Sequence, residues 1–327
     1  MIDLFAVPSP VQYIFDIFPL QTYGPISKKD DVLDNKISER KYYFQGNGTV
    51  KNSLDDTCML GVYNVFEHIE TKKILATDPW CLFVQFSLSK KNSLQSPTIE
   101  ENHQTSNSAK FSIGLLSYLS VKDETLPVLV EGHSKRYIRP CSSINESINA
   151  KLNDNSEELL YMLLLDKVVY DCWITQVFYH IDSKQFLQLY AICDGENASL
   201  LDELTVVEMK KALLQRNSFH LRQSEIVNNI SSPLNLYARC RIEEILSPIF
   251  DDCKKTLLQF EELLTNTPKS NLFTNNGLLT HLNLKISSYI LTIGNLPEST
   301  PLKMFVQANC PSLISNANDS LSRLNNL

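Results

Sequence analysis

Residues 125–146 read TLPVLVEGHSKRYIRPCSSINE, and this stretch decides the fold. Its first part, Val128–Val130, is a short aliphatic run with the composition of a β-strand. Glu131-Gly132 ends the run, and glycine supplies the backbone freedom that a hairpin turn requires. Residues 137–139 then have the composition of a return strand. The stretch therefore predicts an antiparallel hairpin.

Two features flank this predicted hairpin. Leu126-Pro127 precedes its first strand, and because proline makes the cis peptide only slightly unfavourable, both isomers stay open. Ser143 and Glu146 follow the second strand with the spacing of a capping box, in which each side chain satisfies a backbone N–H at a helix start. A helix is expected to begin there. This order of strand, turn, strand and helix resembles the second half of a thioredoxin-like domain.

The residues before the hairpin complete such a domain. Leu60–Phe66 has strand composition, and Thr77-Asp78-Pro79-Trp80 begins a helix with a capping residue and a proline in the first turn, running to about Lys91. Phe111–Leu119 is the next strand candidate. A strand, a helix and a second strand predict a parallel pair joined by a crossover helix.

From Asn155 onward the apolar spacing becomes helical. Asn155 and Glu158 are placed to cap a helix that runs to about His180. This helix contains the longest apolar stretch of the chain, but Asp166, Lys167 and Asp171 interrupt it, so a central helix is favoured over a membrane span. The four-residue spacing of Lys167 and Asp171 predicts an ion pair on one helix face.

Together the two halves predict an α+β fold with the glutathione-transferase-like architecture, a thioredoxin-like domain followed by an all-helical domain. We expect an N-terminal extension over residues 1–57, with an aromatic segment at 1–25 and a connector after it. The thioredoxin-like domain is expected over residues 58–152 and the helical domain over residues 153–327.

Composition narrows the functional classes. The chain has 327 residues, of which 43% are hydrophobic and 20% charged, which is ordinary for a globular protein. Its net charge is −7, and no dense Lys/Arg stripe is present, so nucleic-acid binding is disfavoured. Its 8 cysteines form no C-x-x-C pair and are interpreted as reduced thiols. The six histidines show no metal-ligand spacing, so neither a metal nor another cofactor is expected.

A glutathione-dependent transferase is the enzymatic alternative for this architecture. Cys81 is its one candidate nucleophile, since a helix N-terminus lowers a thiol pKa, but its apolar neighbours favour a core thiol. Ser142 and Ser143 lie where such enzymes hold the glutathione carboxylate at a helix N-terminus. The glutamine that usually precedes this serine is replaced by Arg139-Pro140-Cys141. A binding protein is therefore favoured over a transferase.

Several runs give a more specific resemblance. The chain resembles the family of smaller metaxin-like subunits of the fungal mitochondrial sorting and assembly machinery in PVQYIFDIFPLQTY (10–23), LGVYNVFEH (60–68), ATDPWCLFVQFSLSKKNSL (76–94), LPVLVEG (126–132), LLDKVVYDCWITQ (164–176) and LKISSYIL (284–291). The resemblance covers most of the chain. It implies a peripheral receptor on the cytosolic face of the mitochondrial outer membrane, without enzymatic activity or cofactor. The implied partners are the barrel subunit of the machinery, a second metaxin-like subunit and β-barrel precursors, whose C-terminal sorting signal the family recognises.

Two contacts with these partners are predicted. Because a sorting signal of a β-barrel is itself a strand, it is expected to add to the sheet beside Leu126 and Pro127, although these residues can instead only shape the fold. The proline-bracketed segment 1–25 cannot bury its own apolar surface. It is expected to dock on the barrel subunit or on its own domain through aromatic and apolar side chains, Phe15, Phe18, Leu20 and Tyr23.

Overall fold

The structure is a computed structural model, and it describes the chain with several gaps. The described residues are 39–46, 57–99, 109–121, 125–132, 136–152, 155–192, 200–231, 242–266, 272–275 and 278–326. They belong almost entirely to one compact unit, Arg40–Leu327. The aromatic segment 1–25 and the hairpin turn at 133–135 lie outside the described residues.

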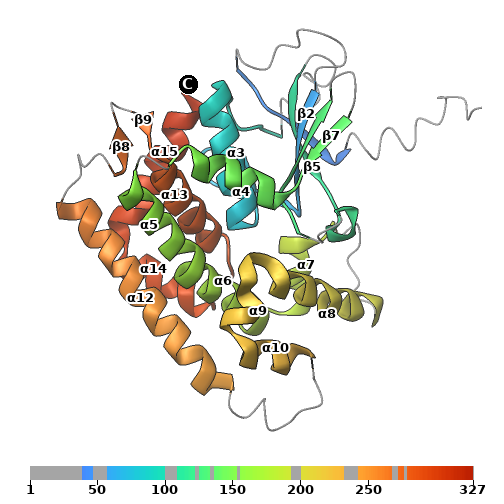
Figure 1. The fold of residues 1–327 in the computed structure, drawn as a ribbon, viewed down its shortest axis with the longest axis vertical. Helices are drawn as coiled ribbons and strands as arrows, with labels where there is room; N and C mark the ends of the chain where they lie inside the picture. The colour runs from blue at the N-terminus through green and yellow to red at the C-terminus, as the bar shows by residue number, and fades with distance from the viewer. Residues whose placement is uncertain are drawn as a thin grey trace, which may run out of the picture. The chain divides into compact units, whose positions relative to one another are not determined.

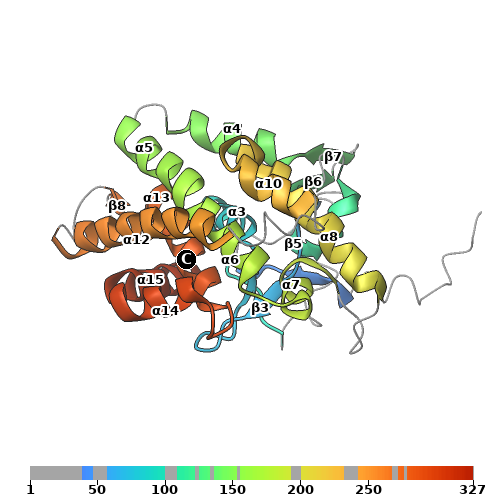
Figure 2. The ribbon, with the colours of Figure 1, turned by 90° about the horizontal axis from the view of Figure 1, so that it is seen from below.

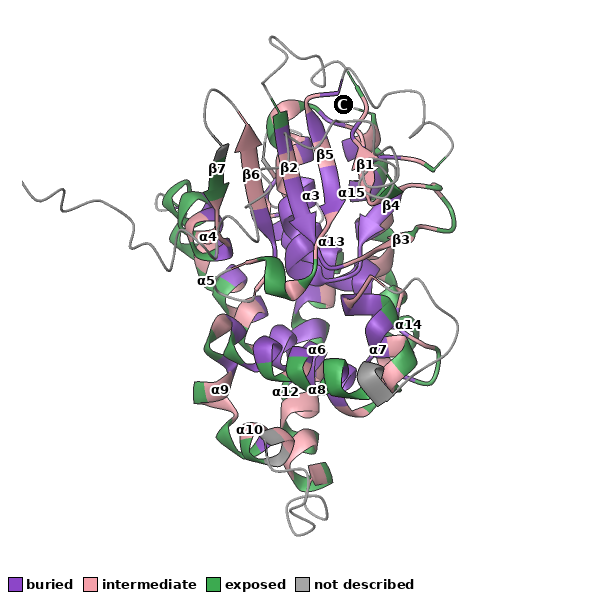
Figure 3. Cartoon of the chain, turned by 90° about the vertical axis from the view of Figure 1, so that its right-hand side faces the viewer, coloured by how far each residue is buried: buried purple, intermediate pink, exposed green. Residues whose placement is uncertain are grey.

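Five strands form one mixed sheet in the order β1-β5-β2-β6-β7. Helix α3 (Pro79–Asn92) covers one face of this sheet, and β7 forms one edge (Figures 1 and 3). The strands have the bounds β1 Lys41–Tyr43, β2 Thr57–Val62, β5 Phe111–Leu115, β6 Val128–Gly132 and β7 Arg136–Arg139.

The predicted crossover is confirmed. Strands β2 and β5 are parallel, with Leu60 opposite Ile113, and α3 connects them. The strand predicted at 60–66 is displaced, however, because β2 ends at Val62 and a separate short hairpin follows, β3 (Val65–Glu67) with β4 (Ile74–Ala76). Asn64 separates the two strands, since its side chain accepts a hydrogen bond from the Val65 amide and donates to the Gln188 and Ala191 carbonyls. Side-chain bonds of this kind compete with continuation of a strand.

The predicted hairpin is also confirmed. β6 and β7 are antiparallel, with Val130 opposite Ile138. The Leu126-Pro127 peptide bond is cis. The predicted capping box is wrong, because helix α4 (Cys141–Ala150) begins at Cys141 and has no side-chain cap. Pro140 takes an extended conformation at the N-cap, so Ser143 lies inside the first turn and its side chain is not at the cap.

Strand β1 is an addition to the predicted architecture. It lies in the range expected to be a connector, pairs antiparallel with β5 and forms the other edge of the sheet. Phe44, directly after β1, is buried. The division of the chain at residues 57 and 152 stays a prediction.

The long helix predicted from Asn155 is present, with a change of pitch in its middle. Helix α5 (Ser156–Leu164) passes through a π-helical turn, Leu165–Val169, into α6 (Tyr170–Tyr179). Asn155 caps α5 as predicted, since its side chain accepts a hydrogen bond from the Glu158 amide. The predicted Lys167–Asp171 pair is wrong. Lys167 is exposed while Asp171 is buried, because the π turn holds an extra residue and separates the two faces.

Helix α13 (His281–Gly294) is deeply buried in the helical part, since its residues 282–293 are all buried. Helices α3, α5, α14 and α15 lie against it (Figures 1 and 2). Residues 301–325 form two helices, α14 and α15, because Pro311 cannot donate to the preceding turn. The other bounds are α7 Ser183–Tyr190, α8 Leu200–Gln215, α9 Phe219–Arg222, α10 Ser224–Ser231, α12 Ile242–Asn266, α14 Pro301–Asn309 and α15 Pro311–Asn325.

In the described ranges, the structure contains no helix with the length and apolar character needed to cross a bilayer. The apolar stretch of α5 and α6 packs instead against α12 and α13.

Candidate functional site

The N-terminal end of α3 is where a transferase of this fold is expected to hold a ligand. Asp78 is the N-cap residue, and one of its carboxylate oxygens, Oδ1, accepts hydrogen bonds from the amides of Trp80 at 3.0 Å and Cys81 at 3.2 Å. Pro79 follows at the first helical position, where no amide is needed. This local geometry is what the sequence TDPW predicts.

The Asp78 carboxylate has a second partner that is distant in sequence. Arg216 donates from both terminal nitrogens, Nη1 to Oδ2 and Nη2 to Oδ1, at 2.7 Å each. The side chains of the two residues are 1% and 0% exposed, so the ion pair is sealed from solvent. Two charges at such depth are tolerated only when paired and hydrogen-bonded, and bidentate geometry supplies both conditions.

Aromatic rings enclose this ion pair. The Arg216 guanidinium lies 4.7 Å from the centroid of the Trp80 ring, and the rings of Tyr63 and Tyr170 are within 6 Å at 5.9 and 5.7 Å. The Tyr190 hydroxyl donates to Asp78 Oδ2 at 3.1 Å. A desolvated guanidinium is attracted to ring faces, so the cage stabilises the charge that it buries.

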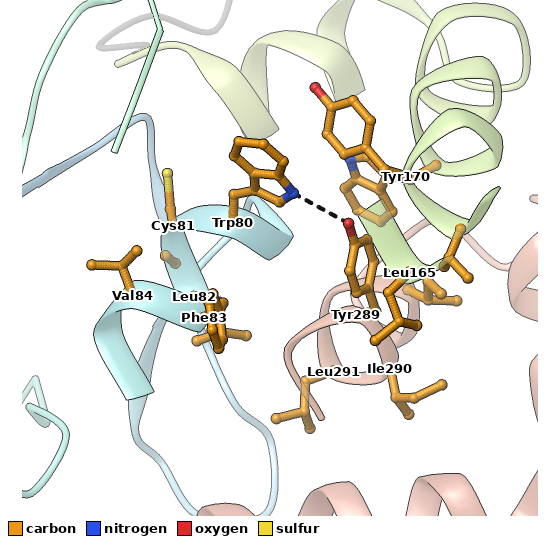
Figure 4. Packing of buried hydrophobic residues seen from close by; sticks show 14 of the residues in the cluster. Trp80, Cys81, Leu82, Phe83, Val84, Leu165, Tyr170, Tyr289, Ile290 and Leu291 are labelled. Carbon is orange, nitrogen blue, oxygen red and sulfur yellow. Dashed lines mark hydrogen bonds between the residues drawn. The ribbon is translucent and has the colours of Figure 1, made fainter. Parts of the chain in front are cut away.

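Trp80 also joins α3 to the helical part of the chain. Its indole nitrogen donates to the Tyr289 hydroxyl on α13 at 3.2 Å, and the ring of Tyr170 on α6 lies beside it at 5.4 Å (Figure 4). Contacts from α3, α6 and α13 therefore meet around one indole ring.

The segment that carries Arg216 is held by hydrogen bonds to the π turn and to α6. Asn217 and Ser218 have positive φ angles of 55° and 54°, a conformation that costs a non-glycine residue roughly 1–2 kcal/mol. The Asn217 side chain donates to the Asp166 carbonyl at 2.5 Å, inside the π turn. Arg222 completes the anchoring through a bidentate pair with Asp171, with its closer contact at 2.6 Å. These bonds offset the strain and fix where Arg216 points.

Cys81 lies in the core, as favoured from the sequence. Burial is the main factor that raises the pKa of its thiol well above the ordinary value, and the Asp78 carboxylate raises it further. Arg216 lowers it to a lesser extent. The thiol is therefore protonated at neutral pH, whereas a nucleophilic cysteine requires a thiolate.

The start of α4 carries the second feature expected of a transferase. Cys141 occupies the first helical position and is buried, and burial raises the pKa of its thiol to about 11. Ser142 is exposed, and Ser143 accepts through its carbonyl a hydrogen bond from the Ser147 hydroxyl at 2.8 Å. The first turn of α4 thus presents a buried thiol and one exposed serine.

The residues predicted to contact a precursor strand are also close to this end of α3. Leu126 is fully buried, and its amide donates to the Tyr63 hydroxyl at 3.0 Å. Pro127 is buried as well. A strand added here would have to compete with Tyr63 for the Leu126 amide. The other predicted contact residues, Phe15, Phe18, Leu20 and Tyr23, lie outside the described residues.

Sequence reasoning found Asp78 as a cap and missed its main partner. Arg216 follows α8 at a separation of 138 residues from Asp78, and no local pattern marks it. Tyr190 was likewise given no role. One signal in the sequence could have indicated a cationic partner. In TDPWC (77–81) the carboxylate of Asp78 lies among aromatic and aliphatic residues, and a buried charge requires a partner of opposite charge.

The mixed sheet, the crossover helix and the helical part packed around α13 define a glutathione-transferase-like fold. In this chain the N-terminal end of the first crossover helix is filled by an ion pair and its aromatic cage.

Comparison with known proteins specifies the family within that fold. A family described as SAM35, a subunit of the SAM complex, matches residues 5–131. The chain is 40% identical over 334 residues to a protein of Saccharomyces cerevisiae named "Sorting assembly machinery 35 kDa subunit", and the alignment covers 98% of each chain. The chain therefore belongs to the SAM35 family. This confirms the resemblance recognised in the sequence.

Proposed function

We propose that this chain is a subunit of the sorting and assembly machinery of the mitochondrial outer membrane and acts there as a receptor without catalytic activity. The observation that carries the proposal is the 40% identity to the yeast protein of that name across 98% of both chains. The protonated, buried Cys81 and the sealed Asp78–Arg216 pair support a binding role over transferase chemistry.

We further propose that the chain lies on the cytosolic face of that membrane. It is held there by the barrel subunit of the machinery, beside a second metaxin-like subunit. The aromatic segment with Phe15, Phe18, Leu20 and Tyr23 is its proposed attachment. Replacing these four residues by alanine should release the chain from membranes at moderate salt. The control replaces Lys28 and Lys29, and retention of the four-residue variant would contradict this attachment.

The proposed substrate is the C-terminal sorting signal of β-barrel precursors, bound as an added strand. Leu126-Pro127 is the place predicted from sequence, and the described sheet offers another at β7. Within the described part of the chain β7 pairs with β6 alone, and its Tyr137 and Ile138 are 58% and 51% exposed (Figure 3). An exposed sheet edge supplies unpaired backbone groups for strand addition.

Site-specific photo-crosslinking separates the two places. A photoreactive residue at Thr125 reports on Leu126-Pro127, one at Tyr137 reports on the β7 edge, and one at the exposed Leu258 on α12 is the control. We expect crosslinks to a radiolabelled precursor signal peptide from at least one of the first two positions and none from Leu258. Equal labelling of all three positions would contradict strand addition to this sheet.

The test of the whole proposal is purification of the tagged full chain from gently solubilised mitochondria. A barrel membrane protein and a second metaxin-like protein should accompany it in comparable amounts. Recovery of the chain in the cytosolic fraction, or retention on immobilised glutathione, would contradict the proposal and favour a soluble adaptor or a transferase.

A further inference from the structure

A second site lies at the C-terminal end of α3, at the other end of this helix from Asp78. It is a cavity of about 290 Å³ bounded by α3, β6, β7, α4 and the first residue of α13. Its walls include apolar side chains, Val84, Leu129, Ile144 and Ile148. The cavity therefore offers an apolar surface between the sheet and two helices.

Basic side chains surround this apolar surface. Lys90, Lys91 and Lys151 line the cavity, and none of their ammonium groups has an ion-pair or hydrogen-bond partner among the described residues. Glu131 lines the cavity and Glu158 acts on Lys90, and both carboxylates have other partners. Glu131 is paired with Arg139 at 3.1 Å, and Glu158 accepts a hydrogen bond from the Leu282 amide at 3.0 Å.

The charge around the cavity is positive, although the chain as a whole has a net charge of −7. Burial lowers the pKa of Lys90, and Glu158 opposes this more than Lys151 adds to it, so the pKa of Lys90 reflects burial. The positive charge acts on His281. Burial, then Lys90 and Lys151, lowers the pKa of His281 to about 4. The cavity thus disfavours further positive charge and favours an anion.

We propose that this basic cavity binds a phosphate group carried on an apolar body. A phosphate presents several acceptor oxygens, so it can bond to more than one ammonium group at once, whereas a single carboxylate carries less charge. The apolar walls then hold the carbon chain next to the phosphate. A membrane phospholipid with an anionic headgroup and a soluble phosphorylated compound share this chemistry. The site is independent of the proposed receptor function.

The test uses the full chain and dihexanoyl phosphatidic acid, a soluble short-chain lipid, titrated by calorimetry at moderate salt. Replacing both Lys90 and Lys151 by alanine should weaken binding by at least about tenfold, because two charge-assisted hydrogen bonds are lost. The matched control replaces Lys254 and Lys255 on α12 and should bind as the unmodified chain does. Inorganic phosphate should bind more weakly than the lipid, since it leaves the apolar walls unused.

Vesicles distinguish the two sources of the phosphate. Co-sedimentation with phosphatidylcholine vesicles containing phosphatidic acid, lost in the Lys90/Lys151 variant, assigns the site to a membrane lipid. Binding of the soluble lipid without co-sedimentation assigns it to a soluble compound. The proposal is overturned if the double variant binds the short-chain lipid as well as the unmodified chain. It is also overturned if an acidic peptide, and no phosphate ligand, occupies the cavity.

Discussion

The two ends of α3 carry charge in opposite ways. At the N-terminal end, Asp78 and Arg216 are buried, paired bidentately and enclosed by aromatic rings. At the C-terminal end, Lys90 and Lys151 line a cavity, and neither has an ion-pair partner among the described residues. One helix therefore carries a closed ion pair at one end and an open basic cavity at the other.

The N-terminal end of α3 contributes to stability, whereas the C-terminal end is available to bind a ligand. A buried bidentate pair enclosed by aromatic rings holds segments of the chain together and leaves little space for a ligand. Unpaired like charges around a cavity destabilise the free protein slightly, which is the usual cost of a binding site. The transferase-like fold is thus preserved here while the end of α3 expected to bind glutathione is occupied by the chain's own side chains.

The largest expected effect follows from Arg216→Met. The substitution leaves the Asp78 carboxylate buried without its cation, so we expect the free energy of unfolding to fall by about 3–5 kcal/mol. Urea denaturation followed by circular dichroism measures it. Lys211→Met is the matched control, because Lys211 pairs with Glu208 on the surface, and it should change stability by less than about 0.5 kcal/mol. A loss below about 1 kcal/mol for Arg216→Met would show that the closed pair does not hold the fold.

A smaller loss is expected from Tyr289→Phe. This change removes the acceptor of the Trp80 indole N–H, which stays buried, and an unsatisfied buried donor costs about 1–3 kcal/mol. The same denaturation experiment measures it. Tyr137→Phe, on the exposed edge strand, should be neutral. Equal stability of the two variants would contradict a role for the indole bond in joining α3 to α13.

At the other end of α3, loss of charge should be almost without effect on stability. Replacing Lys90 and Lys151 by methionine removes two charges that have no ion-pair partner among the described residues, so the free energy of unfolding should change by less than about 0.5 kcal/mol or rise slightly. Thermal unfolding at fixed pH checks this. A loss comparable to that of Arg216→Met would mean that these lysines are structural, and the contrast between the two ends would fail.

The smallest effect concerns pH. Burial and the two lysines lower the pKa of His281 to about 4 in the folded chain, below its ordinary value of about 6.5. Between these values the unfolded chain binds the proton and the folded chain does not, so this histidine makes stability fall as pH falls from about 6.5 to about 4. His281→Gln should reduce that slope in urea titrations. An unchanged slope would contradict the lowered pKa of His281.

Local sequence patterns correctly predicted the start of α3 and the hairpin of β6 and β7. TDPW predicts the start of α3 because the cap and the first-turn proline act within four residues, and the hairpin of β6 and β7 follows from alternating strand and turn residues. The capping box at Ser143 failed although its spacing was correct. Pro140, three residues earlier, had already fixed the N-cap conformation.

Long-range features were not accessible in the same way. The pairing of Asp78 with Arg216 depends on a turn with two left-handed residues, Asn217 and Ser218, which no composition rule marks. The basic cavity gathers Lys90 of α3, Lys151 directly after α4 and His281 of α13, so no stretch of sequence shows it. The addition of β1 to the sheet is a third case, since three residues carry too little pattern to identify a strand.

Hydrogen exchange of the full chain, with glutathione and with dihexanoyl phosphatidic acid, tests the contrast between the ends of α3 most directly. We predict that glutathione changes exchange nowhere in residues 77–83, because Asp78, Arg216 and the aromatic cage fill that end. Phosphatidic acid should slow exchange in residues 88–94 and 147–152, around the basic cavity. Protection of residues 77–83 by glutathione, without protection around the cavity by the lipid, would contradict the account.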